Sequence, residues 1–177
     1  MNQSFDYNIV LIGFMGTGKS TISEYMNQKF GMEVIEMDQI IAQRQGMTIS
    51  KIFETYGEEY FRELETNLLI ELQEKKNLII SCGGGVPMKE RNVVEMKKNG
   101  KVVLLTATPE TILKRVRNNH DRPLLEGRKN EAYISELMEK RRAKYEAAAD
   151  IQVATDNRNK QQICDEMVKK LRESEKS

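Results

Sequence analysis

The amino-acid sequence predicts an α/β fold built on a parallel sheet. Short apolar runs alternate along the chain with longer segments of helical period. Strands that alternate with helices in this way pair in parallel, because each helix carries the chain back across the sheet. A glycine-rich segment also lies between the first apolar run and the first helical segment. The runs expected to form the five strands are residues 7–12, 33–36, 78–81, 101–106 and 150–154.

Helices are predicted where apolar residues recur at helical spacing, which indicates one buried face. The three stripes are Ile22, Met26 and Phe30; Phe61, Leu64, Leu68 and Leu72; and Ile163, Met167 and Leu171. Another helix is expected to begin at Thr108, Pro109 and Glu110, which match a cap, a first-turn proline and an acid suited to the helix dipole. The charged tail from Arg172 onward is expected to fray.

Length and composition suit one domain spanning residues 1–177, with 39% hydrophobic residues to form its core. Lysine and arginine number 28 against 27 aspartate and glutamate, so the overall charge favours neither nucleic acid nor a membrane surface as a partner. Cys82, Cys164 and the one histidine, His120, form no familiar zinc, disulfide or hydrolase pattern. No stretch approaches the length of a membrane span. We expect a cytoplasmic protein that acts as a monomer.

Residues 13–20 carry the motif G-x-x-x-x-G-K-[ST], preceded by an apolar strand and followed by an amphipathic helix as the motif requires. Its glycines let successive backbone N–H groups turn toward nucleotide phosphates at the positive end of the helix. Lys19 supplies a cation to the β- and γ-phosphates, and the Ser20 hydroxyl is placed to bind Mg²⁺. The residues expected to bind ATP here are Gly16, Thr17, Gly18, Lys19, Ser20 and Thr21.

The remaining motifs favour a small-molecule kinase over a GTPase switch or an ATPase motor. No aspartate has a glycine three residues later, and residues 118–121 lack the lysine of a guanine-reading motif. The third apolar run ends in Ser81-Cys82-Gly83 rather than in the acid typical of a motor. Residues 118–128 are polar and irregular, which suits a mobile lid that excludes water during phosphoryl transfer.

Asp38 and Arg62 are candidates for binding the acceptor, and each has a plainer structural alternative. Asp38 follows the second strand, where it is placed to accept a hydroxyl proton, but it also suits the N-cap of a helix over residues 39–45. Arg62 precedes an apolar stripe and taken alone suits a solvated helix surface.

The other acceptor candidates are a glycine run and two arginines. The run 83–85 follows the third strand, where it lets backbone amides approach a ligand or forms a plain flexible turn. Arg122 and Arg141 add cations suited to a phosphate or a carboxylate.

Together these motifs resemble those of the shikimate kinase family, from the first strand to the last helix. The matching elements are individually short beyond the phosphate loop, but their order and spacing are specific. They are residues 13–20, Asp38, residues 57–62 with Glu65, residues 83–85, residues 122–125, and Arg141 four residues before Tyr145.

The resemblance implies a P-loop fold of the nucleoside-monophosphate-kinase type. Its five-stranded parallel sheet would have the order 2-3-1-4-5, with helices on both faces and a lid at about residues 118–128. The implied reaction transfers the γ-phosphate of ATP, with Mg²⁺ as cofactor, to the 3-hydroxyl of shikimate, in the pathway to chorismate and aromatic amino acids. Shikimate would bind within about residues 37–65.

On the acceptor side, the resemblance implies that Asp38 holds the shikimate hydroxyls and acts as catalytic base. Arg62 and Arg141 would hold the carboxylate, a bidentate task that suits guanidinium groups. The glycines implied to bind substrate are Gly83, Gly84 and Gly85, with Gly84 offering a backbone contact.

On the nucleotide side, the resemblance implies that Lys19 and Arg122 are catalytic, with Arg122 stabilising charge on the transferring phosphoryl group. Arg115 and Arg158 would contact the adenine side of ATP. Glu36 stands where the family often has an aspartate that positions Mg²⁺ through water; glutamate keeps the charge and adds a methylene.

Three alternatives stay open at this point. A proline is common between Arg141 and Tyr145 in the family, and here Arg142 competes with Arg141, although the spacing to Tyr145 favours Arg141. The acceptor is alternatively another hydroxy acid such as gluconate. The chain is alternatively a non-catalytic ATP-binding switch, which would need no acceptor pocket.

Overall fold

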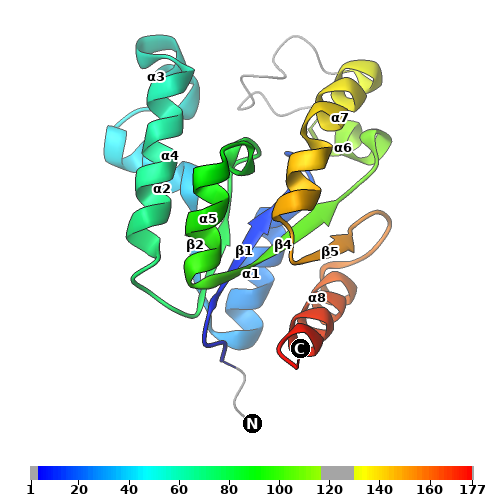
Figure 1. Ribbon diagram of the computed structural model, residues 1–177. Helices are drawn as coiled ribbons and strands as arrows, with labels where there is room; N and C mark the ends of the chain where they lie inside the picture. The colour runs from blue at the N-terminus through cyan, green and yellow to red at the C-terminus, as the bar shows by residue number, and fades with distance from the viewer. Residues whose placement is uncertain (1–3, 117–129, 177) are drawn as a thin grey trace.

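The computed structural model describes residues 4–116 and 130–176, and Figure 1 shows a central sheet between two layers of helices. The sheet has five parallel strands in the order β2-β3-β1-β4-β5, which confirms the predicted fold class and strand order. The predicted lid lies outside the described residues. Within them, no helix combines the length and apolarity needed to cross a membrane.

The strands lie within a residue or so of the apolar runs that predict them. They are β1 (Asn8–Ile12), β2 (Glu33–Glu36), β3 (Leu78–Ser81), β4 (Gly100–Thr106) and β5 (Ile151–Ala154). The helices are α1 (Lys19–Phe30), α2 (Met37–Gln45), α3 (Ile49–Tyr56), α4 (Glu58–Leu72), the short 3-10 helix η1 (Val86–Met88), α5 (Glu90–Lys98), α6 (Pro109–Val116), α7 (Glu131–Ala148) and α8 (Lys160–Ser174).

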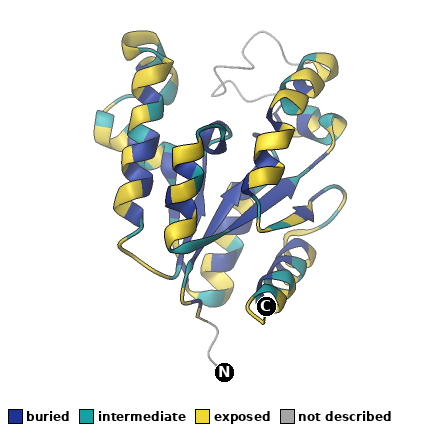
Figure 2. Cartoon of the chain, viewed as in Figure 1, coloured by how far each residue is buried: buried dark blue, intermediate teal, exposed yellow. Residues whose placement is uncertain are grey.

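The central strands β1 and β3 are buried along their whole length and apolar except for Asn8 and Ser81 at their ends, because helices cover both faces of the sheet. In β1, Val10 and Ile12 point into one core, and Ile9 and Leu11 point into the other. Helices α1 and α8 complete the second core, while the other long helices contribute to the first. Figure 2 shows the central strands largely buried and the outer helix faces exposed.

Two local predictions are wrong. Helix α2 begins at Met37 with Glu36 at its N-cap, so Asp38 lies inside the first turn and does not cap the helix. Helix α8 continues to Ser174, and the tail is held because the Arg172 guanidinium lies 4.1 Å from the centre of the Phe5 ring. The residue expected to cap α6 does so, since Thr108 Oγ1 accepts a hydrogen bond from the Thr111 amide.

Candidate active site

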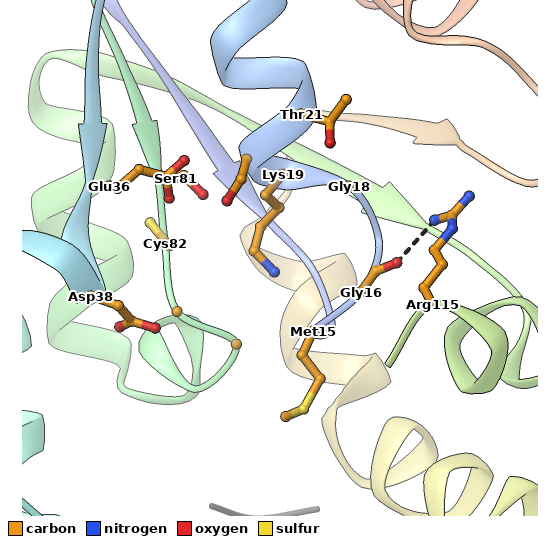
Figure 3. A pocket seen from close by; sticks show the side chains of 13 residues that line it. Met15, Gly16, Gly18, Lys19, Thr21, Glu36, Asp38, Ser81, Cys82 and Arg115 are labelled. Atoms are coloured by element: carbon orange, nitrogen blue, oxygen red, sulfur yellow. Dashed lines mark hydrogen bonds between the residues drawn. The ribbon is translucent and has the colours of Figure 1, made fainter. Parts of the chain in front are cut away.

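A cavity of about 320 Å³ lies at the carboxyl ends of β1, β2 and β3. Ligands of open α/β sheets bind at this edge, because the loops that leave neighbouring strands meet there. Figure 3 shows side chains around it from the phosphate loop, the start of α1, the ends of β2 and β3, the start of α2 and the end of α6. The lining residues are Met15, Gly16, Gly18, Lys19, Ser20, Thr21, Glu36, Asp38, Ser81, Cys82, Gly83, Gly84 and Arg115.

The phosphate loop folds back around its own lysine. Lys19 Nζ donates to the carbonyl oxygens of Gly13 at 2.7 Å and Phe14 at 3.1 Å, which satisfies a cation that is only 9% exposed. Gly16 has φ +81°, and a Cβ atom there would lie 2.9 Å from Val116 Cγ1, so the position requires glycine. The loop therefore holds the ammonium group of Lys19 at the wall of the cavity.

Two acidic side chains from different helices meet over Gly83. A Cβ atom at Gly83 would lie 3.0 Å from Asp38 Oδ1 and 3.1 Å from Glu65 Oε2. Asp38 comes from the first turn of α2, and Glu65 comes from the middle of α4. The glycine is what allows both carboxylates to approach the end of β3.

Arg62 is the counter-ion of Glu65 and is not a solvated surface residue. Its Nη1 donates to Glu65 Oε1 at 2.9 Å and its Nη2 donates to Glu58 Oε2 at 3.1 Å. Its side chain is 16% exposed, and the guanidinium lies 5.4 Å from the centre of the Phe61 ring. These contacts fix a planar, charged fork beside the glycine run, an arrangement suited to a carboxylate.

Burial raises the pKa of Glu65 to about 7, although the positive charge of Arg62 opposes that rise and the nearby Asp38 adds to it. The Glu65 side chain is fully buried, and its Oε2 accepts no hydrogen bond from any residue that the structure describes. The sequence signal for this residue was the spacing of three from Arg62, which brings two side chains together on a helix. That spacing predicts an ion pair and says nothing of burial.

Each glycine of the run 83–85 faces a predicted acceptor residue. A Cβ atom at Gly85 would lie 2.5 Å from Arg62 Nη1, and one at Gly84 would lie 2.9 Å from Arg141 Nη1. With Gly83 against Asp38, the three positions pack against three separate side chains. The run is a tightly packed surface rather than a flexible turn.

Arg141, rather than Arg142, faces the site. Arg141 is 7% exposed, and its Nη1 lies 3.5 Å from the Tyr145 hydroxyl, which in turn donates to Gly84 O at 2.6 Å. Arg142 is exposed and pairs with Glu139 at 3.1 Å. Of the two arginines, Arg141 is thus the one that packs against the glycine run.

Arg115 and Arg158 line a second cavity of about 330 Å³, which also touches the phosphate loop at Thr17, Gly18 and Thr21. Arg115 Nη1 donates to Gly16 O at 2.9 Å, as Figure 3 shows, and to Thr155 Oγ1 at 3.1 Å. Arg158 donates to the carbonyl oxygens of Ala154 and Gln162. Both arginines thus line a cavity next to the phosphate loop.

Not every predicted residue reaches the first cavity. Arg62, Gly85 and Arg141 are not among its lining residues; Arg62 packs against Gly85, and Arg141 packs against Gly84. The Thr17 hydroxyl turns inward and donates to Phe14 O, while Thr17 lines the second cavity. Arg122 lies outside the described residues.

Comparison with known proteins gives a consistent result. A sequence model described as shikimate kinase matches residues 15–172. A shikimate kinase of Dehalococcoides mccartyi is 39% identical over 168 residues, which cover 95% of each chain. The solved structure of shikimate kinase from Acinetobacter baumannii in complex with shikimate has a TM-score of 0.90 and 31% identity, covering 95% of this chain and 94% of that one. A gluconokinase from Sinorhizobium meliloti has a TM-score of 0.61 at 14% identity over 96% of this chain and 94% of its own, a likeness of fold alone.

Proposed function

The chain belongs to the shikimate kinase family, and from this premise we propose how its residues transfer the γ-phosphate of ATP to the 3-hydroxyl of shikimate. One observation carries the proposal. The glycine run packs against Asp38, Arg62 and Arg141 at the strand edge that also holds the phosphate loop. An acceptor with hydroxyl groups and a carboxylate matches the groups that converge there.

On the acceptor side, Arg62 and Arg141 bind the carboxylate of shikimate, and Asp38 accepts the proton of the attacking hydroxyl. Arg62 and Arg141 reach the same glycine run from α4 and α7, so they approach an acceptor from two directions. Gly83, Gly84 and Gly85 have no side chains, which lets Asp38, Arg141 and Arg62 approach the backbone of the run closely. The proposed substrate-binding segment covers about residues 37–65. A carboxylate base positioned on the reacting hydroxyl contributes roughly 10²- to 10⁴-fold to the rate.

On the nucleotide side, the N–H groups of Gly16, Gly18 and their neighbours cradle the phosphates. Lys19 exchanges its loop carbonyls for the β- and γ-phosphates, because charged phosphate oxygens are stronger acceptors than neutral carbonyls. Arg115 and Arg158 contact the adenine side. Arg122 is proposed to stabilise charge on the transferring group.

The donor set also fits Mg²⁺. Ser20, Glu36 and Asp38 line one cavity, and the described residues contain no group of three His, Cys, Asp or Glu side chains that would form a protein cage. Mg²⁺ is usually held by one or two protein oxygens together with phosphates and water. We propose the Ser20 hydroxyl as a ligand, with Glu36 acting through water. When bound, the ion would neutralise charge on the β- and γ-phosphates.

We place the reaction in the cytoplasm and expect a monomer. Both cysteines, Cys82 and Cys164, are free thiols, which supports a reducing compartment.

A substrate panel tests the proposed function. The release of ADP from ATP is measured with shikimate, with gluconate at the same concentration, and without an acceptor. We expect ADP release to depend on shikimate, and mass spectrometry to find one added phosphate on it. Turnover with gluconate alone would support the other hydroxy acid, and tight ATP binding without any phosphorylated acceptor would support a non-catalytic switch.

A further inference from the structure

The buried side chain of Asn92 joins three elements beside the glycine run. Asn92 lies in α5 and is 1% exposed. Its Nδ2 donates to Val86 O in η1 at 2.9 Å, and its Oδ1 accepts from Thr66 Oγ1 of α4 at 2.7 Å. A carbonyl can only accept, so the amide nitrogen must face Val86, which leaves the oxygen for the Thr66 hydroxyl.

The two ends of this link adjoin the acceptor side of the site. Thr66 follows Glu65 directly and lies one helical turn after Arg62. Val86 follows Gly85 directly, and Gly85 packs against the guanidinium of Arg62. The link therefore connects α4 to the residue that follows the glycine run, and neither Thr66 nor Asn92 lines the cavity.

The glycine run is held from its other side by α7. Tyr145 donates to Gly84 O at 2.6 Å, and Lys144 Nζ donates to Met88 O at 2.9 Å. On the side that faces α4, Asn92 of α5 holds the same turn by donating to Val86 O. Losing it would release one side of the turn and leave the other fixed.

We propose that Asn92 and Thr66 are positioning residues for the acceptor, which set the separation between Arg62 and the glycine run. The inference rests on the proposed function, since it assumes that this surface binds shikimate. A Cβ atom at Gly85 would lie only 2.5 Å from Arg62 Nη1, so there is no slack between the two surfaces. Small displacements of positioning groups cost orders of magnitude in rate when they misplace a reactant.

The structure supplies a matched control in Asn8, whose amide is fully buried and also makes two hydrogen bonds. Its Nδ2 donates to Lys75 O at 2.9 Å, and its Oδ1 accepts from the Leu78 amide at 3.0 Å. Asn8 begins β1 and Leu78 begins β3, so this link lies at the edge of the sheet opposite the cavity. Replacing Asn8 therefore removes two buried amide hydrogen bonds, as replacing Asn92 does, without changing a contact on the acceptor side.

The test compares Asn92→Leu with Asn8→Leu by steady-state kinetics and thermal unfolding. We expect both variants to lose a similar amount of thermal stability. Only Asn92→Leu should raise the KM for shikimate, by about tenfold, while the KM for ATP stays within about twofold. Should a leucine variant fail to fold, Thr66→Val and Thr66→Ser give the answer. Valine removes the hydroxyl at nearly constant shape and should raise the KM for shikimate. Serine keeps the hydroxyl, so Thr66→Ser should have a KM for shikimate close to that of the wild type.

An unchanged shikimate KM in the folded variants, Asn92→Leu or Thr66→Val, would overturn the inference and leave the link a purely structural one. An equal rise in Asn8→Leu would also overturn it. The wild type is measured first, because a wild type without shikimate-dependent turnover contradicts the proposed function itself. Normal wild-type turnover with unaffected variants contradicts only the positioning role.

Discussion

Asp38 and Glu65 bring two carboxylates to Gly83, and the two groups differ in what surrounds them. Glu65 is fully buried with its charge partner Arg62, whereas Asp38 is half-buried and lines the cavity. Burial favours the neutral form of a carboxylic acid, which is why the pKa of Glu65 is raised. Of the two carboxylates, Asp38 is the one that lines the cavity, so we propose it as the base, while Glu65 holds Arg62.

Replacing the proposed base should affect chemistry and spare nucleotide binding. We expect Asp38→Asn to lower kcat by roughly 10²-fold or more, because the amide keeps the shape but cannot take the hydroxyl proton. The Kd for ATP should change by less than about twofold, since the phosphate loop is untouched. Stopped assays for kcat and calorimetry for ATP measure the two quantities. Wild-type kcat in the variant would remove Asp38 from the mechanism.

The raised pKa of Glu65 predicts a pH dependence of stability. The folded pKa of about 7 lies above the ordinary glutamate value of 4.5, so the folded state holds more protons between these pH values. The free energy of unfolding must therefore fall as the pH rises from about 4.5 to about 7, and change little from this group above that. One pKa unit corresponds to about 1.4 kcal/mol, so the loss reaches about 3 kcal/mol.

Urea unfolding of the wild type and Glu65→Gln at about pH 5 and about pH 8 measures this loss. Relative to Glu65→Gln, the wild type should have a lower free energy of unfolding at about pH 8 than at about pH 5. An unfolding free-energy difference between the two proteins that is the same at both pH values would mean that Glu65 is ionised throughout.

At the scale of elements, the glycine run is the surface on which three helices converge. Gly85 has φ −90°, a backbone conformation open to any residue, so its need for glycine comes from the neighbouring Arg62 and not from the turn. This separates packing from conformational strain at a single position.

Gly85→Ala therefore tests the packing directly. The added methyl would lie 2.5 Å from Arg62 Nη1, so the guanidinium must move. We expect the KM for shikimate to rise by about tenfold with the fold intact, because a displaced fork loses its bidentate contact. Circular dichroism and kinetics together check this. A variant with wild-type KM would show that Arg62 binds nothing that requires its present position.

Elements with continuous apolar runs were predictable, and elements defined by contacts were not. The strands follow from the sequence because helices cover both sheet faces, so Ile9 to Ile12 of β1 and Leu78 to Ile80 of β3 are continuous apolar runs. Helix α5 gave no such signal, since it buries Asn92, Glu95 and a single apolar residue, Met96. The polar partners of Asn92 lie in other elements, and no local pattern encodes them.

At the scale of the whole molecule, one sheet edge collects residues that follow four of the five strands. The phosphate loop, Asp38 and the glycine run follow β1, β2 and β3, and Thr155 with Arg158 follow β5. The strand order came from the resemblance to a family, because alternation of strands and helices predicts a parallel sheet but not the order of its strands. The phosphate loop was found from its motif, whereas the burial of Arg62 and Arg141 required the packed fold.

The most direct test of this arrangement is calorimetric titration of shikimate into wild type, Arg62→Ala and Arg44→Ala. Arg44 is the control, because it also forms a two-pronged pair, with Glu71, but its side chain is 54% exposed and lies away from both cavities. We predict that Arg62→Ala binds shikimate at least about tenfold more weakly while Arg44→Ala binds like wild type. Equal shikimate affinity in all three proteins would contradict the acceptor site proposed here.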